Sequence, residues 1–506
     1  MSLNGEESGS GRRRNPLGYF GIDFGTTNST AVEVEDGLRE QKYGDEAGRP
    51  LPSILLVDKI TGKVKSGREV WENRERYLSL PDQFHVISSL KAELESPHPV
   101  KSIVGNWTKP KLVAEVLKHL ANRVSSRHAS LTRATFSVPV GMSPAARRLL
   151  RQAAHIAGVS VTAFVKESTA ALMPHWHALQ SCTYVAVFDW GGGTLDVSIL
   201  KLGTDGIDER ATRPLAKAGI HIDREFAEFV HQRIMKDRGV SKPFEGVSDA
   251  DRDALIDYCE RAKCALSEKA HGVFDLRYDG AGARFELTRE DLNAVASPFV
   301  EQAIGTLSAA IEEAGISPER VDRILILGGS SKLQLLHETL EQDPRFRSKL
   351  QWPADPDWAV AHGAALLEQH PGCFALSETI SLELSDADQF CLFGPGEVSP
   401  SVEQSVSLGI VDQRPEGASA HDARIIVNKC LPGQLTPRPL RRFTVPVQGF
   451  VEEEVRLTYQ LTEDQTFRMT AHAPRTGRQP IVDETEKLRF SYRMEPTNVL
   501  KRTRTV

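Results

Sequence analysis

Three glycine-rich loops with neighbouring hydroxyl and carboxylate side chains follow one another along this 506-residue chain. They are GIDFGTTNST at residues 21–30, VFDWGGGTLDVS at 187–198 and ILILGGSSK at 324–332. Each contains or follows an apolar run, which predicts a strand ending in a tight turn. Glycines let backbone N–H groups approach the oxygens of a triphosphate, and hydroxyls and carboxylates suit its metal. The three loops predict a nucleotide held between two related halves.

Asp23 and Asp189 stand at the ends of the first two of these strands. Mg²⁺ prefers oxygen ligands and retains several of its waters, so two carboxylates at opposing strand ends suit it. The alternative is that both residues only cap turns. The pairing of the two loops favours the metal.

Composition narrows the class of function. The net charge is −6 and the pI is about 6.2, so no overall charge attracts nucleic acid or an anionic membrane. Six cysteines are scattered without a CxxC pair, which is typical of reduced thiols and indicates a cytoplasmic protein. No apolar run approaches the roughly 20 residues of a membrane helix. We therefore expect neither a nucleic-acid nor a membrane partner.

The elements that position the loops follow from periodicity. Residues 19–56 predict a meander of strands, and the apolar spacing predicts helices over 71–94 and 109–127. Ser143 and Pro144 predict the start of a helix over 145–158.

The second half repeats this plan. Strands are expected over 184–200 and 324–327, with helices over 223–267, 289–315 and 359–368. The pattern predicts a duplicated α/β domain. After Pro371 the chain alternates apolar and polar residues, as at Val455, Leu457, Tyr459 and Leu461, which predicts antiparallel strands with one buried face.

The sequences of the first two loops, GTTNS and GGGTLD, resemble those of the heat shock protein 70 (DnaK-type) family. The same resemblance extends to the stretch ATFSVPVGMSPAARRLLRQAAHIAGV at 134–159. The resemblance covers most of residues 19–369. It implies a duplicated actin-like (ribonuclease H-like) ATPase domain followed by a smaller antiparallel β-sandwich-like domain, here without the family's helical lid.

The resemblance also implies domain boundaries. The expected parts are a disordered leader at 1–18, a nucleotide-binding domain at 19–370 with halves at about 19–180 and 181–370, a linker and start of the β region at 371–404, a β-rich peptide-binding-like domain at 405–493 and a tail at 494–506.

Catalytic roles come from the same resemblance. Glu167, followed by Ser168 where the family has proline, matches the glutamate that orients the attacking water. Thr194 and Asp196 match a phosphate-contacting hydroxyl and a second acid near that water, and Asp23 serves both catalysis and the metal. Pro139 and Arg147 match the residues that transmit nucleotide state to the linker.

Nucleotide contacts are implied for three groups of residues. The phosphate group comprises Gly25, Thr26, Thr27, Asn28, Gly191, Gly192, Gly193 and Thr194. The adenosine helix supplies Glu260, Lys263 and Ser267, which share one helical face. The third loop supplies Gly328, Gly329, Ser330 and Lys332, and this lysine lacks the planar guanidinium of the family's stacking arginine.

Two departures from the family's sequence concern the rate of ATP hydrolysis. In HVISSLKAELE, the register that aligns Leu90 puts Ser88 where the family has a lysine, with Lys91 one helical turn further on as the alternative. The family's glycine pair before the insert is expected at Ile222 and Asp223.

The expected function is an ATP-binding and slowly ATP-hydrolysing chaperone that uses ATP/ADP and Mg²⁺. Its implied partners are unfolded or extended polypeptides, a J-domain co-chaperone and a nucleotide exchange factor. A nucleotide-gated binding or scaffold protein with little hydrolysis is the alternative, favoured by Ser88, an altered linker and the missing lid. A small-molecule kinase ranks below both because it leaves the β-rich region unexplained.

Overall fold

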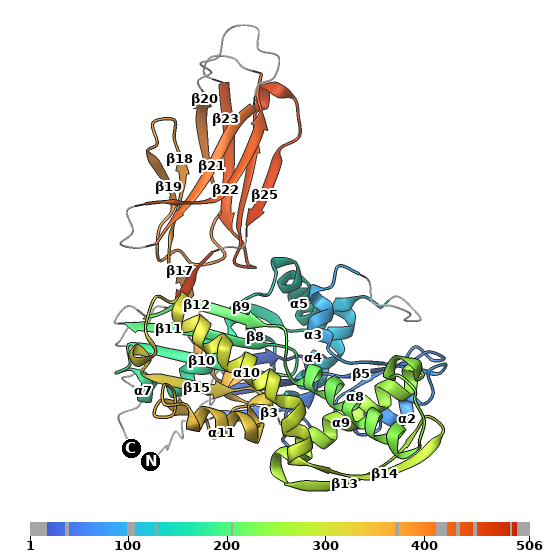
Figure 1. Ribbon diagram of the computed structural model, residues 1–506. Coiled ribbons are helices and arrows are strands. Elements are labelled where there is room, and N and C mark those ends of the chain that lie inside the picture. The colour runs from blue at the N-terminus through green and yellow to red at the C-terminus, as the bar shows by residue number, and fades with distance from the viewer. Residues whose placement is uncertain are drawn as a thin grey trace, which may run out of the picture.

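The computed structural model describes residues 18–35, 40–98, 107–127, 129–203, 206–369, 374–410, 422–431, 436–448, 453–485 and 488–492. A tall β-sandwich stands on a larger α/β body, with β17 at the point where they meet (Figure 1). The leader predicted at 1–18, apart from Gly18, and the tail predicted at 494–506 lie outside the described residues.

The first half of the body is built on a sheet of order β3-β2-β1-β8-β9. Its strands are β1 (Tyr19–Phe24), β2 (Asn28–Val34), β3 (Glu40–Tyr43), β8 (Arg133–Val138) and β9 (Ser160–Lys166), and β4 (Leu51–Pro52) pairs with β2. The first three strands form an antiparallel meander, whereas β8 and β9 run parallel to β1. Parallel neighbours require crossover connections, which here contain helices.

The second half repeats that order as β12-β11-β10-β15-β16. The strands are β10 (Tyr184–Trp190), β11 (Leu195–Gly203), β12 (Gly206–Leu215), β15 (Arg323–Leu327) and β16 (Leu350–Gln351). Again three antiparallel strands are followed by two parallel ones. The repeated order agrees with the duplication expected from the sequence, and it places the ends of β1 and β10 at equivalent positions.

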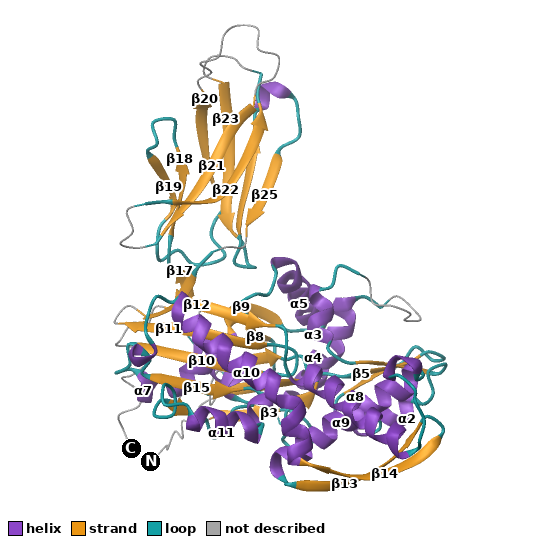
Figure 2. Cartoon of the chain, in the orientation of Figure 1, coloured by secondary structure: helices purple, strands orange, loops and turns teal. Residues whose placement is uncertain are grey.

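Helices pack on these sheets and fill the crossovers (Figure 2). In the first half they are α4 (Lys109–Ser125), α5 (Pro144–Ile156), α6 (Glu167–Leu172), η1 (Met173–His175) and α7 (Trp176–Leu179). In the second half they are α8 (Gly219–Asp237), η2 (Phe244–Gly246), α9 (Asp249–Glu268), α10 (Arg289–Glu313), η3 (Pro318–Arg320), η4 (Gly329–Lys332), α11 (Gln334–Gln342) and α12 (Ala359–Glu368). The Ser143 hydroxyl accepts a hydrogen bond from Ala146 N and caps α5, as its sequence predicts.

Helix α10 is long and apolar enough to cross a membrane by composition alone. It packs against β11, β12 and α8, however, and buries residues such as Phe299, Leu307 and Ile311 there. These faces of α10 are apolar because they pack in the core of the second half.

The prediction of one helical stretch over 71–94 is wrong. The segment contains the end of α1 (Arg68–Glu72), α2 (Arg74–Leu78), a strand, β7 (Phe84–Ile87), and α3 (Leu90–Glu95). Strand β7 pairs with β5 (Leu55–Asp58), which also pairs with β6 (Val64–Ser66). Pairing with a distant strand overrides the helical period of this segment.

Two adjacent segments complete the second half. Strands β13 (His271–Tyr278) and β14 (Ala281–Thr288) form a hairpin beside α9. Its turn residue Asp279 has a φ of 50°, in the left-handed region that short polar side chains tolerate.

The sandwich has two four-stranded sheets, of order β19-β18-β21-β22 and β20-β23-β24-β25. Their strands are β18 (Thr379–Glu383), β19 (Gln389–Phe393), β20 (Gln404–Ile410), β21 (Asp422–Cys430), β22 (Arg438–Pro446), β23 (Glu453–Leu461), β24 (Phe467–His472) and β25 (Ile481–Thr485), with η6 at Pro474–Thr476. The sandwich thus begins with β18, within the stretch 371–404 expected to hold the linker and the start of the β region. The alternation predicted for Val455, Leu457, Tyr459 and Leu461 buries all four.

Two short strands, β17 (Phe374–Leu376) and β26 (Phe490–Tyr492), flank the sandwich in sequence but belong to the sheet of the second half. That sheet therefore has seven strands and ends β11-β12-β26-β17. The sequence analysis gives no indication of either pairing.

Candidate nucleotide site

The first two glycine loops face each other at the junction of the two halves. A Cβ placed on Gly192 would lie 2.0 Å from the Thr27 hydroxyl oxygen, and one on Gly193 would lie 3.1 Å from that of Thr26. Such contacts leave no room for a side chain on Gly192. The structure therefore brings together the two loops that the sequence proposes as the two sides of one phosphate site.

Asp23 and Asp189 occupy equivalent places on β1 and β10, each one residue before the strand end. Buried apolar neighbours, Ile22 and Phe24 on β1 and Phe188 and Trp190 on β10, hold both strands in the core. The Ser137 hydroxyl donates to the Asp23 carboxylate at 2.7 Å. The third loop approaches the other acid, since a Cβ on Gly328 would lie 2.6 Å from Asp189 Oδ1.

Lys91, and not Ser88, reaches this site. Its ammonium group lies 2.5 Å from Glu167 Oε1, and the two side chains are only 11% and 13% exposed. Ser88 is exposed to solvent. The prediction that Ser88 takes the lysine position is wrong because β7 ends at Ile87 and the chain turns at Ser89, whose φ is 56°, into α3. Lys91 then stands in the first turn of α3.

The acidic side chains shift one another's proton affinity. Burial raises the pKa of Asp189 well above its ordinary value, and the Glu167 and Asp23 carboxylates raise it further. Burial likewise raises the pKa of Glu167 and of Asp196. Burial alone would lower the pKa of Lys91, but Glu167, Asp23 and Asp189 together raise it. Carboxylates so arranged stabilise a cation.

The acids outnumber the single ammonium group, so the site fits a divalent cation by charge. In the described part of the chain, no three acidic, histidine or cysteine side chains come close enough to hold a metal directly. This spacing suits Mg²⁺ in particular, because that ion keeps much of its water shell and needs only one or two carboxylates. Asp23 and Asp189 are the residues best placed to hold it.

Thr194 and Asp196 lie beside the second loop. The Thr194 hydroxyl donates to Asp196 Oδ2 at 3.0 Å, and the backbone N–H of Gly191 donates to the Thr194 carbonyl at 3.0 Å. Asp196 pairs in register with Asp189 across β10 and β11. The loop is thus a closed turn that presents a hydroxyl and a carboxylate on the same side as the strand-end acid.

The remaining residues of the first loop also follow the local backbone. A Cβ on Gly25 would lie 2.2 Å from the Asn28 carbonyl oxygen, which explains the glycine there. Asn28 is exposed at the first position of β2. Ser168 is buried directly after Glu167 at the start of α6.

Comparison with models of known protein families identifies the family of this chain. The family model described as Hsp70 protein matches residues 81–373, more than half of the chain. The chain belongs to the Hsp70 family. The matched region includes Lys91, Glu167 and the second and third glycine loops. Members of the Hsp70 family are in general soluble ATPases that bind ATP or ADP with Mg²⁺ and act as chaperones for unfolded polypeptides.

Gly219 is the glycine that contacts the second loop. Its N–H lies 3.4 Å from the Gly191 carbonyl, and Ile220 N donates to Gly192 O at 2.8 Å. A Cβ on Gly219 would come within 2.8 Å of the Ser330 hydroxyl. The assignment of the glycine pair to Ile222 and Asp223 is therefore wrong by one turn of α8, and the place is held by Ala218 and Gly219.

Asp223 has a different task. Its carboxylate receives the Lys263 ammonium at 2.7 Å, and Lys263 also donates to the Gly219 carbonyl at 3.2 Å. This pair ties α9 to α8. Ser267 lies one turn further along α9 and donates to the Lys263 carbonyl at 2.9 Å.

The third loop is fastened to the second. The Ser330 hydroxyl donates to the Gly191 carbonyl at 2.7 Å. Gly328 has a φ of 84°, which a residue with a side chain rarely adopts, and Gly329 opens η4. Lys332 is more than half exposed and pairs with Asp357 at 2.8 Å.

The sequence analysis missed Arg74, which connects the two halves. Arg74 on α2 donates to Glu260 at 2.7 Å and contacts the Asp257 carboxylate, both on α9. Its guanidinium also lies 4.4 Å from the ring centroid of Trp71. No motif marks Arg74 in the charged stretch WENRERYL, so only the fold shows its role.

Two further residues are predicted to transmit nucleotide state. Pro139 follows β8, and Arg147 is buried on the first turns of α5. Helix α5 also carries Arg151, which pairs with Asp464 of the sandwich.

Proposed function

We propose that this protein is an ATP-binding and ATP-hydrolysing chaperone of the heat shock protein 70 type. The observation that carries the proposal is the buried Lys91–Glu167 pair beside two facing glycine loops. Phosphoryl transfer to water depends mainly on positioning and on stabilisation of charge, and this set of groups provides both.

Each residue has a distinct task in this proposal. Glu167 orients the attacking water and accepts its proton, with Asp196 and Thr194 as neighbouring polar groups. Lys91 stabilises negative charge on the transferred phosphoryl group. Mg²⁺, held through Asp23 and Asp189, supplies neutralisation of the phosphate charge. The loops offer backbone N–H groups from Gly25–Asn28 and Gly192–Thr194, while the N–H of Gly191 closes the turn of the second loop.

The adenosine end is assigned to Glu260, Lys263, Ser267 and the third loop, Gly328–Lys332. Gly219 supports the assignment because it lies between Lys263, Ser330 and Gly192. Asp223 neutralises Lys263, so we propose that Lys263 binds the ribose through hydrogen bonding more than through its charge.

For the second domain, we propose binding of extended polypeptide segments, coupled to nucleotide state through Pro139 and Arg147. A β-sandwich with antiparallel strands suits recognition of an extended backbone. A J-domain co-chaperone and a nucleotide exchange factor are proposed partners, and the cytoplasm is the proposed compartment. The proposed boundary of the nucleotide-binding domain near 370 is supported by the end of α12 at Glu368, and the β region proposed from within 371–404 by the start of β18 at Thr379.

The alternative, a nucleotide-gated binding or scaffold protein with little hydrolysis, loses one of its three supports, which were Ser88, the altered linker and the missing lid. It rested in part on the absence of the lysine, and Lys91 is present beside Glu167. The altered linker, which partly lies outside the described residues, still favours it.

Single-turnover hydrolysis and calorimetry decide between the two functions. We expect Mg-ATP binding and measurable turnover in the wild type. Glu167→Ala is expected to retain binding and to lose about 10²-fold in rate. Glu312→Ala, which removes an exposed carboxylate on α10, is the matched control and should behave as the wild type. ATP binding with no turnover in the wild type would support the alternative, and equal rates in all three proteins would refute the role of Glu167.

A further inference from the structure

The last described strand, β26, returns from the sandwich to the nucleotide-binding body. It lies between β12 and β17 in the sheet of the second half, with Ile207 opposite Tyr492 and with Phe374, Ala375 and Leu376 opposite Tyr492, Ser491 and Phe490. The two ends of the sandwich are therefore paired with each other and with the body. A domain on a single connecting segment would have only one such attachment.

Polar groups fix the segment before β26. The Ser377 N–H donates to the Arg489 carbonyl at 2.9 Å, and the Arg489 N–H donates to Glu378 Oε1 at 2.9 Å. Glu378 is almost fully buried, and burial raises the pKa of its carboxyl. A buried carboxylate that accepts a backbone hydrogen bond is costly to leave unpaired, so this contact resists separation.

Apolar packing adds to the attachment. The Phe374 and Phe490 rings stack with centroids 5.6 Å apart, and both rings and Tyr492 are buried. One continuous core connects Val187 and Ile207 of the body, through Tyr492 and Phe374, to residues of the sandwich such as Phe467. Burial of these large apolar side chains stabilises the attachment.

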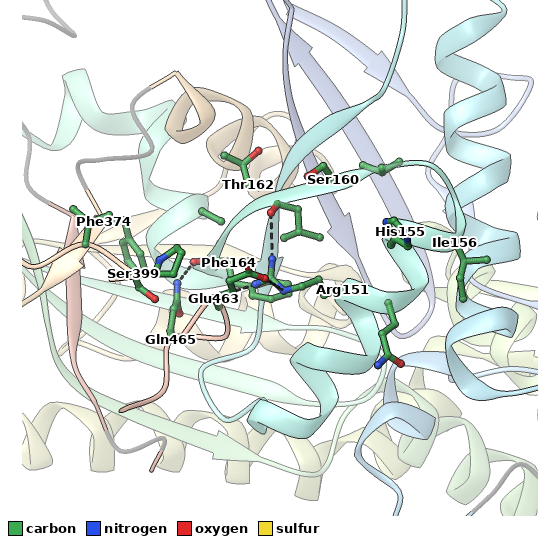
Figure 3. Close-up of a pocket in the computed structure, with 16 residues that line it drawn as sticks. Arg151, His155, Ile156, Ser160, Thr162, Phe164, Phe374, Ser399, Glu463 and Gln465 are labelled. Carbon is green, nitrogen blue, oxygen red and sulfur yellow. Dashed lines mark hydrogen bonds and ion pairs between the residues drawn. The ribbon is translucent and has the colours of Figure 1, made fainter. Parts of the chain in front are cut away.

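The sandwich meets the first half through polar side-chain contacts. Arg151 on α5 reaches Asp464 at 3.2 Å, Arg148 reaches Glu484 at 2.8 Å and is 43% exposed, and the Gln465 amide donates to the Phe164 carbonyl. Arg151, Phe164 and Gln465 line a cavity of about 900 Å³ between α5, β9 and the sandwich (Figure 3). Solvent weakens the Arg148 pair, and among the described strands none pairs the sandwich with the first sheet.

We propose that residues Leu488–Tyr492 form an intramolecular strap that keeps the sandwich attached to the second half throughout the nucleotide cycle. Motion driven by the nucleotide then opens and closes the Arg151–Asp464 side, next to the cavity, and the domains do not separate. The nucleotide-dependent part rests on the proposed function, whereas the attachment itself follows from the pairing of β12, β26 and β17.

Hydrogen exchange on the intact chain tests the cycle. Amides at Ser377 and Arg489 are expected to show the same protection without nucleotide, with Mg-ADP and with Mg-ATP, while protection across Thr462–Thr466 changes. Loss of protection at the strap in any of the three states would overturn the proposal, as would unchanged protection at Thr462–Thr466.

Truncation tests the attachment without nucleotide. Removal of residues 488–506 is expected to increase the radius of gyration in small-angle scattering and to expose residues 374–378 to protease. Removal of residues 494–506 is the control and should change neither. Unchanged scattering in the longer truncation would overturn the proposal.

A milder variant covers the case in which the truncated chain does not fold. Phe490→Ala, in the otherwise intact chain, is expected to reduce protection at Ser377 at least tenfold, and unchanged protection would also overturn the strap. If calorimetry shows no ATP binding, the proposed function fails, yet the truncation and Phe490→Ala experiments still judge the strap because they need no nucleotide.

Discussion

The Lys91 ammonium group lies 2.5 Å from a carboxylate oxygen of Glu167, and the two residues stand in the first turns of α3 and α6. The pair has one charge of each sign next to Asp23 and Asp189. This relationship supports the proposal that Lys91, and not Ser88, takes part in turnover.

Lys91→Ala is therefore expected to retain ATP binding and to reduce single-turnover hydrolysis by about 10²-fold or more, because a positioned cation near the transferred group is lost. Ser88→Lys serves as the control and should leave the rate unchanged, since Ser88 faces solvent. Faster hydrolysis by Ser88→Lys would instead support the alignment that puts Ser88 at the family's lysine position.

Asp189→Asn is expected to raise the Mg²⁺ concentration needed for tight ATP binding. The substitution removes one of two strand-end carboxylates while keeping the size of the side chain. Calorimetric titrations with ATP at several Mg²⁺ concentrations measure the effect. Identical Mg²⁺ dependence in variant and wild type would place the metal elsewhere.

Arg74→Ala is expected to speed nucleotide dissociation about tenfold, equivalent to 1.4 kcal/mol, because α2 then no longer binds α9 across the junction. Arg74 is 5% exposed, so its loss also leaves the Asp257 carboxylate buried with fewer partners. Release of a fluorescent ATP analogue in stopped flow gives the rate. Arg76→Ala on the same helix is exposed and should match the wild type.

Gly363→Ala is expected to destabilise the protein by about 3 kcal/mol, measured by denaturant unfolding. A Cβ on Gly363 would collide with the Ala170 carbonyl, where α12 crosses α6. Gly305→Ala in the exposed face of α10 meets nothing within 4 Å and should stabilise by about 0.5 to 1 kcal/mol. Equal effects of the two substitutions would contradict the close crossing.

Sequence reasoning succeeded where local chemistry decides the structure. The apolar strands before the glycine loops, the Ser143 cap and the alternation in β23 are each specified within about ten residues, and each occurs as predicted. The family resemblance, carried by the loop sequences, is confirmed by the match over residues 81–373. The roles assigned to the individual site residues stay predictions.

The failures share a physical cause. Strand β7 exists because β5 is there to pair with it, and a helical period in its own sequence could not show this. The errors at Ser88 and at Ile222–Asp223 are both shifts of about one helical turn in the alignment with the family. The first depends on the turn at Ser89 and the second on the start of α8 at Gly219, and neither is visible in the sequence. Strand β26 has three residues, too few for any periodic signal.

Helix α12 joins several of these parts into one stiff unit. A Cβ on Gly21 of β1 would lie 2.1 Å from the Ala361 carbonyl, so the helix backbone rests directly on the strand that carries Asp23. At its other end, the Glu368 carboxylate accepts hydrogen bonds from Arg133, Thr135 and Thr162 on β8 and β9. At Gly21 no side chain separates β1 from α12, so we expect the strand and the helix to move together. A displacement of Asp23 would then also reach Gln369, which follows α12 on the way to the sandwich.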